Sequence, residues 1–164
     1  MIKKLNTLIL TMLGIGNSKY VPGTVASLVT CLIYIWLYNF QVNISFLILS
    51  VFIIFIYSVY SIDSLKFSFS EIDAREIVID EFIGQSIPVL TIYNFIDKNN
   101  LNHFIFFTFI SFMLFRIFDI LKPYPINKID RDMKNGFGVI LDDIVAGVYS
   151  SFILLIVIFL TTYA

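Results

Sequence analysis

Long uninterrupted runs of apolar residues alternate with short polar segments along the chain. No charged residue occurs at the 43 positions from Tyr20 to Ile62, and the polar stretch 39–43 divides this run in two. An apolar helix needs ~20 residues to cross a bilayer, so the run predicts two spans. Three more apolar runs follow downstream. The five predicted helical segments are residues 25–38, 44–62, 82–96, 103–118 and 144–162.

These runs predict helices rather than strands. Residues 46–55 are apolar at nearly every position, whereas a membrane β-strand alternates apolar and polar residues. Within hydrocarbon, a helix pairs all its backbone N–H and C=O groups by itself. We therefore expect an all-α, polytopic membrane helical bundle with about four to five apolar segments, forming one domain over residues 1–164. The segment 82–96 has only 15 residues, so it is either a short span or a re-entrant helix.

The composition supports a membrane protein. The chain is 59% hydrophobic and 14% charged, against ~25% charged residues in ordinary soluble domains. The net charge of −1 gives no electrostatic reason to expect nucleic acid as a partner. Cys31 is the only cysteine, so neither an internal disulfide nor a thiolate metal cluster can form.

The charged residues gather in two loops, 63–81 and 119–143. With five spans, both loops and the N-terminal segment share one side and, with Arg116 at the boundary, hold ten of the eleven Lys and Arg residues. Lys98 lies on the other side. Basic loops stay in the cytoplasm, so we expect an inner-membrane protein with cytoplasmic charged loops and an external C-terminus. A re-entrant segment 82–96 would put the loop 119–143 outside, which the charge rule disfavours.

The first polar cluster lies at residues 73–84 and reads D-A-R-E-I-V-I-D-E-F-I-G. On a helix, Glu76, Asp80 and Gly84 would share one face. The adjacent Asp80 and Glu81 repel each other unless a cation or a basic residue lies between them. A divalent cation with oxygen ligands would relieve this repulsion. The alternative is a pair of acids that interact with the N-terminal end of a helix dipole.

The second cluster lies at residues 115–126 and reads F-R-I-F-D-I-L-K-P-Y-P-I. Arg116, Asp119 and Lys122 recur every three residues, so one helical side could present all three. Arg and Lys are natural phosphate ligands. The prolines at positions 123 and 125 should end the helix. Anchoring at the membrane surface would explain the lysine, but not an acid placed between two bases.

The third and fourth clusters complete the set. Asp142 and Asp143 form a second acidic pair, followed by the small residues 146–147, which permit close helix packing. Two acidic pairs, each followed by small residues, predict helices that converge on one cation. Upstream, P-G-T at residues 22–24 predicts a turn and a helix N-cap. Its free N–H groups and the Thr24 and Ser27 hydroxyls can receive a phosphate, although plain capping explains the pattern equally well.

Taken in order, the four clusters resemble the phosphatidylglycerophosphatase A family. The family's patterns are G-x-G…P-G-T-x-G-S, D-x-x-x-I-V-x-D-E-x-x-G, F-R-x-F-D-x-x-K-P-x-P-I and G-x-G-x-x-x-D-D-x-x-A-G, and the chain follows them over about residues 14–147. Two positions depart from the family. Ala26 stands where glycine is usual, and Lys19 where proline is common, which leaves the shape of the first loop less defined.

The resemblance implies hydrolysis of phosphatidylglycerophosphate to phosphatidylglycerol and inorganic phosphate at the cytoplasmic face, with Mg²⁺ as cofactor. The lipid substrate and the bilayer are the implied partners, and the oligomeric state is not predicted. We expect the following roles: Asp80, Glu81, Asp142 and Asp143 as magnesium ligands; Arg116 and Lys122, with Thr24 and Ser27, as phosphate ligands; and Asp119 as a further ligand or base. Asp80, Asp119, Arg116 and Lys122 are thus the expected catalytic residues.

Two other classes of protein compete with this interpretation. A CDP-alcohol phosphotransferase also uses metal-bound carboxylates, but its D-G-x-x-A-R…G…D…D pattern is missing. A non-catalytic membrane subunit or ion carrier could use the acidic cluster as a cation site. Such a protein would place acids in the middle of its spans, whereas these acids lie at span edges.

Overall fold

The computed structural model describes residues 2–65, 74–97 and 100–163. The described residues form helices and connecting segments, with no strand among them. The predictions for Asp73 and Lys98 fall outside the described residues. In chain order the elements are α1 (Ile2–Leu10), the 3-10 turn η1 (Ile15–Asn17), α2 (Pro22–Asn39), α3 (Ile44–Leu65), α4 (Ile79–Phe95), α5 (Leu101–Leu121), α6 (Ile126–Asp132) and α7 (Gly136–Tyr163).

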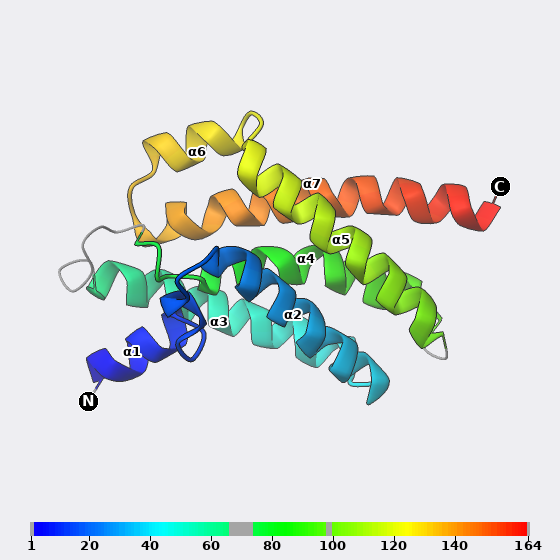
Figure 1. Cartoon of the computed structure of the whole chain (residues 1–164), viewed down its shortest axis with the longest axis horizontal. Helices are drawn as coiled ribbons and strands as arrows, with labels where there is room; N and C mark the ends of the chain where they lie inside the picture. Colours follow the sequence, from blue (N-terminus) through cyan, green and yellow to red (C-terminus); the bar gives the residue numbers. More distant parts are fainter. Residues whose placement is uncertain (1, 66–73, 98–99, 164) are drawn as a thin grey trace.

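Five of these helices cross the molecule in alternating directions. α2, α4 and α7 run away from the end that holds the N-terminus, and α3 and α5 run back toward it (Figure 1). The α2–α3 and α4–α5 links meet at the far end. There the Tyr38 hydroxyl donates to the Asp97 carbonyl, and the Tyr93 hydroxyl donates to the Val42 carbonyl at 2.6 Å. The near end, which we call the charged end, gathers α1, α6 and the starts of α4 and α7.

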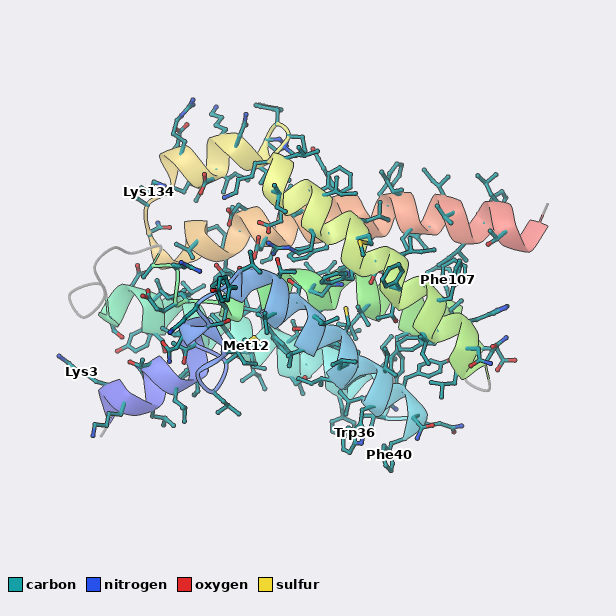
Figure 2. All side chains as sticks on the ribbon, viewed as in Figure 1. Lys3, Met12, Trp36, Phe40, Phe107 and Lys134 are labelled. Atoms are coloured by element: carbon teal, nitrogen blue, oxygen red, sulfur yellow. The ribbon has the colours of Figure 1, made fainter. Side chains whose placement is uncertain are left out.

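Four of the described helices, α2, α3, α5 and α7, are long and apolar enough to cross a membrane. Their outward faces carry large exposed apolar side chains, among them Phe46 at 70% and Phe152 at 67% exposure. Lipid tails would cover such faces, so the chain is an integral membrane protein. Figure 2 shows Trp36 and Phe40 together at the far end, where aromatic residues mark a membrane interface.

α4 is the central helix and the shortest of the five that cross. It contacts α2, α3, α5 and α7, and more than half of its 17 residues are buried. A helix of this length extends about 26 Å, slightly less than a typical hydrocarbon core. It runs from the charged end to the α2–α3 link without turning back, so the predicted segment 82–96 crosses the bundle. It also begins earlier than expected, at Ile79, and so contains Asp80 and Glu81.

α4 and α7 cross closely because two glycines face each other. A Cβ on Gly84 would lie 2.7 Å from the Asp143 carbonyl oxygen, and a Cβ on Gly147 would overlap the Gly84 carbonyl. Ala146 beside them is fully buried. The predicted close approach at these small residues is confirmed, and it brings the two acidic pairs to the same height in the bundle.

The first correction concerns Glu76, which does not share a helical face with Asp80 and Gly84. Glu76 lies in a turn before α4 begins. The backbone here is held by α1 and η1, because the Val78 N–H donates to the Leu10 carbonyl at 3.0 Å. A side chain at Gly16 would overlap the Glu76 carbonyl, so the η1 turn packs directly on this segment. These contacts keep residues 74–78 out of the helix.

The second correction concerns the start of α2, where Thr24 is not the N-cap. Val21 is the N-cap residue, without a side-chain capping bond, and Pro22 opens the helix. Proline suits the first helical position because its φ is preset and its missing N–H needs no partner there. Thr24 therefore lies inside the first turn of α2.

Candidate active site

Three carboxylates from two helices converge at the charged end. Asp80 and Glu81 stand in the first turn of α4, and Asp143 stands in the second turn of α7. One ligand oxygen from each lies within 4.8 Å of the other two. Asp80 is 8% exposed and Asp143 is 4% exposed. We call these three residues the carboxylate triad.

The triad has the properties of a divalent cation site. Like charges buried together are unstable unless a cation neutralises them. The Glu81 Oε2 atom is buried and has no hydrogen-bond partner among the described residues. Magnesium takes oxygen ligands at about 2.1 Å, so its neighbouring ligand oxygens lie roughly 3–4 Å apart. Three hard oxygen donors at this spacing can hold a hard divalent cation such as magnesium, and they suit no soft metal.

Asp142, the fourth predicted metal ligand, does not join the triad. Its Oδ2 lies 2.8 Å from Lys122 Nζ. Consecutive residues on a helix point about 100° apart, so Asp142 and Asp143 project in different directions from α7. Asp143 faces the triad, and Asp142 faces the end of α5. The structure thus gathers three of the four predicted ligands and pairs the fourth with a predicted phosphate ligand.

Lys122 lies just after the end of α5, and not on the helix as the spacing had predicted. It is the C-cap of α5 with φ 41°, a left-handed conformation that favours glycine or asparagine. Arg116, Asp119 and Lys122 are therefore not aligned on one helical side. Burial alone would lower the pKa of Lys122, but hydrogen bonds and charges from Asp142 and Asp130 outweigh it and hold this pKa above its ordinary value. Lys122 adopts a backbone conformation that costs free energy for any residue with a Cβ.

Arg116 and Asp119 form an ion pair beside the triad. Arg116 Nη1 lies 2.7 Å from Asp119 Oδ2, and the two side chains are 16% and 15% exposed. Asp119 is close enough to Asp143 and Glu81 for their charges to interact, so the ion pair borders the triad. Arg116 Nε is buried without a hydrogen-bond partner among the described residues. This N–H is a donor that a phosphate oxygen can use.

The start of α2 closes another side of the site. A Cβ on Gly23 would overlap Glu81 Oε1 and would lie 3.4 Å from Arg116 Nη1. The Glu81 carboxylate therefore sits against the N-terminal end of α2, where the helix dipole stabilises negative charge. Thr24 is half-buried in the same turn. Ser27 is fully buried, and its hydroxyl donates to the Gly23 carbonyl at 2.9 Å. The phosphate-binding roles of Thr24 and Ser27 stay predictions.

Sequence reasoning missed Asp130. Its Oδ1 lies 3.0 Å from Lys122 Nζ. In the sequence it resembles an ordinary loop charge within D-R-D at residues 130–132. One signal could have found it. Ile126 and Asp130 are four residues apart, so a short helix that buries Ile126 turns Asp130 toward the same neighbours.

Acidic oxygens suited to a metal lie beside two cationic side chains, all at one end of a bundle that is otherwise wrapped in apolar residues. This combination suits a phosphate ester carried by a lipid, with the head group at the charged end and the acyl chains in the bilayer. The fold and the site therefore define an integral membrane enzyme that hydrolyses lipid phosphates.

Comparison with known proteins gives the family. The family model described as Phosphatidylglycerophosphatase A matches residues 8–158. The chain is 30% identical to the Phosphatidylglycerophosphatase A of Haemophilus influenzae, covering 99% of this chain and 93% of the relative. The protein of that name from Escherichia coli is 33% identical, with 86% and 76% covered. A Bacteroides thetaiotaomicron protein named "Putative phosphatidylinositol-3-phosphatase" is 33% identical, with 93% and 92% covered. No solved structure matches. The chain belongs to the phosphatidylglycerophosphatase A family and is a lipid phosphatase.

Proposed function

We propose that this protein hydrolyses phosphatidylglycerophosphate to phosphatidylglycerol and inorganic phosphate, in a magnesium-dependent step of phospholipid biosynthesis. Membership of the family and the names of the H. influenzae and E. coli relatives support the substrate. The observation that carries the mechanism is the buried carboxylate triad next to Arg116 and Lys122. Six carboxylates, counting Asp119, Asp130 and Asp142, lie in or beside this site with only two cationic side chains, so the site needs more positive charge.

Each side chain of the site has a separate role in hydrolysis. Magnesium bound by Asp80, Glu81 and Asp143 would supply positive charge where the phosphoryl group transfers. Arg116 uses its buried Nε–H to bind a phosphate oxygen, and Lys122 supplies a second, compact charge. Asp119, paired with Arg116, can accept the proton of the attacking water. The bond from phosphorus to the lipid oxygen breaks, the water oxygen takes its place, and the proton passes to the departing alcohol.

The charge distribution supports an active site at the cytoplasmic face of the inner membrane. Figure 2 shows Lys3 and Lys134 at the charged end, away from Trp36 and Phe40. Arg116 and Lys122 lie at the same end, so nearly all described basic residues share one side of the bundle. Basic residues of short loops stay in the cytoplasm, and the lipid head group would be reached from there.

The Bacteroides relative suggests a second substrate, a phosphoinositide. Both lipids present a phosphate monoester at a membrane surface, so the triad and its cations would suit either. The head groups differ, because one is a linear glycerol and the other a ring. The ion-carrier alternative fits less well, since the family consists of enzymes and the acids stand in the first two turns of α4 and α7.

Phosphate release from the purified protein in mixed micelles tests the proposal. We expect release from phosphatidylglycerophosphate to exceed release from phosphatidylinositol 3-phosphate, to stop with EDTA and to return with magnesium. Asp80→Asn should abolish activity while the fold is retained, because it removes one of several buried like charges. Asp132→Asn, on the exposed face of α6, is the matched control and should be active. Release that survives both EDTA and Asp80→Asn would contradict the proposal, and release from the phosphoinositide alone would contradict its substrate.

A further inference from the structure

We propose that Asp130 is a positioning residue that holds the Lys122 ammonium at the mouth of the site, with one N–H left for the substrate phosphate. The inference rests on the proposed function and adds a residue from α6 to the machinery.

Lys122 stands between two carboxylates that differ in depth. Its Nζ lies 2.8 Å from Asp142 Oδ2 and 3.0 Å from Asp130 Oδ1. The Asp142 side chain is 9% exposed, and the Asp130 side chain is 33% exposed. Asp142 therefore belongs to the buried acidic interior, and Asp130 lies at the surface in contact with water. The ammonium is held at the boundary between them.

The element that carries Asp130 is fixed in place. Ile126, one turn earlier on α6, is fully buried and packs with Phe115 and Ala146. Just before α6, the Tyr124 carbonyl accepts a hydrogen bond from the Tyr149 hydroxyl of α7 at 3.1 Å. α6 is thus docked on α5 and α7, so the Asp130 carboxylate is presented from a supported position rather than from a free loop.

Two bound carboxylates leave Lys122 with one free donor. An ammonium has three N–H groups, and Asp142 and Asp130 take two of them. The third can bind a phosphate oxygen that arrives at the mouth of the site. Without Asp130 the long, flexible side chain has only the deep partner, and the ammonium would move toward the triad. The phosphate would then lose its nearest lysine contact.

The neighbouring ion pair on α6 provides a matched control. Arg131 Nε lies 2.8 Å from Asp132 Oδ1, and these side chains are 74% and 44% exposed. Removing the Asp132 charge therefore alters the same helix by the same chemistry, without touching Lys122.

Steady-state hydrolysis of phosphatidylglycerophosphate in mixed micelles tests the role. A partly exposed ion pair is worth up to about a factor of five in an equilibrium, so Asp130→Asn should lower kcat/KM about fivefold, mainly by raising KM. Asp132→Asn should stay within about twofold, since an ion pair on the exposed surface contributes little. Asp130→Glu should restore part of the loss. In a Lys122→Met background, Asp130→Asn should have no further effect, because the residue acts through the lysine.

A second measurement covers the case in which Lys122→Met is too slow to assay. Inorganic phosphate should raise the unfolding temperature of the magnesium-loaded protein. The rise should be smaller for Asp130→Asn. It should also be small for Lys122→Met, and adding Asp130→Asn to Lys122→Met should not change it further. An Asp130→Asn enzyme that matches the unsubstituted protein would overturn the inference. So would losses in activity or in phosphate response that simply add to those of Lys122→Met. Failure of the unsubstituted protein to hydrolyse the lipid would instead count against the proposed function.

Discussion

Gly84→Ala tests whether the close crossing of α4 and α7 sets the geometry of the site. The new Cβ would lie 2.7 Å from the Asp143 carbonyl oxygen, 2.7 Å from Phe115 Cε2 and 2.9 Å from Asp143 Cβ. Ordinary van der Waals contact begins at about 3.5 Å, so about 0.8 Å must be gained. The Phe115 ring can turn away, but Asp143 can yield only if α7 moves. The displaced residue is itself a member of the triad.

The variant should lose far more activity than stability. Overpacking costs about 1–3 kcal/mol, and replacing glycine by alanine within a helix returns up to about 1 kcal/mol. A shift of about 1 Å in a reacting group can lower the rate by roughly 100-fold. We therefore expect kcat/KM to fall about 10- to 100-fold while the free energy of unfolding falls by no more than about 2 kcal/mol.

Phosphate release and thermal unfolding in the same detergent measure the two effects. Thr91→Val is the matched control. It removes the 3.3 Å hydrogen bond between Thr91 of α4 and Ser151 of α7, farther from the charged end, and it adds no bulk. Such a bond is worth about 0.6 kcal/mol in a membrane, so this variant should keep its activity. A Gly84→Ala enzyme within twofold of the unsubstituted protein would refute the claim that this crossing aligns the triad.

Two further substitutions test other contacts of the site. Gly23→Ala places a methyl group where Glu81 Oε1 lies, so the magnesium concentration for half-maximal activity should rise, and an unchanged magnesium titration would contradict the placement of Glu81. Asp63→Ala removes the acceptor that lies 2.8 Å from the Gly136 N–H at the start of α7, and a lost helix cap costs about 1 kcal/mol. Asp63→Asn should keep most of that stability in thermal unfolding, and equal losses in both variants would argue against capping.

The spans and the acidic pairs could be predicted because their signals are local. Charge-free runs longer than a bilayer thickness leave little choice but helices, and the structure confirms an all-helical bundle. Acidic pairs next to small residues are anomalous at a membrane edge, so the sequence predicts that both pairs converge, and three of their four carboxylates lie together. The glycines at positions 84 and 147 likewise act at the crossing where they were expected.

Which charged residues join the triad and which pair with Lys122 could not be predicted, because this depends on how each helix is rotated about its axis. The sequence gives no means of deciding whether Asp142 or Asp143 faces α4. α5 ends at Leu121, so Lys122 is its C-cap and lies against Asp142 and Asp130. No rule of residue spacing predicts these contacts. Asp63 belongs to a charged loop in the sequence, yet its carboxylate accepts a hydrogen bond at the start of α7. These contacts join residues far apart in the chain.

A crystal structure of the purified protein, crystallised with Mn²⁺, would test most directly whether the three carboxylates hold one cation. Manganese replaces magnesium at oxygen sites and gives an anomalous signal. The account predicts an anomalous peak bounded by the carboxylates of Asp80, Glu81 and Asp143. A fully active protein whose manganese lies elsewhere, with these three carboxylates apart, would contradict it.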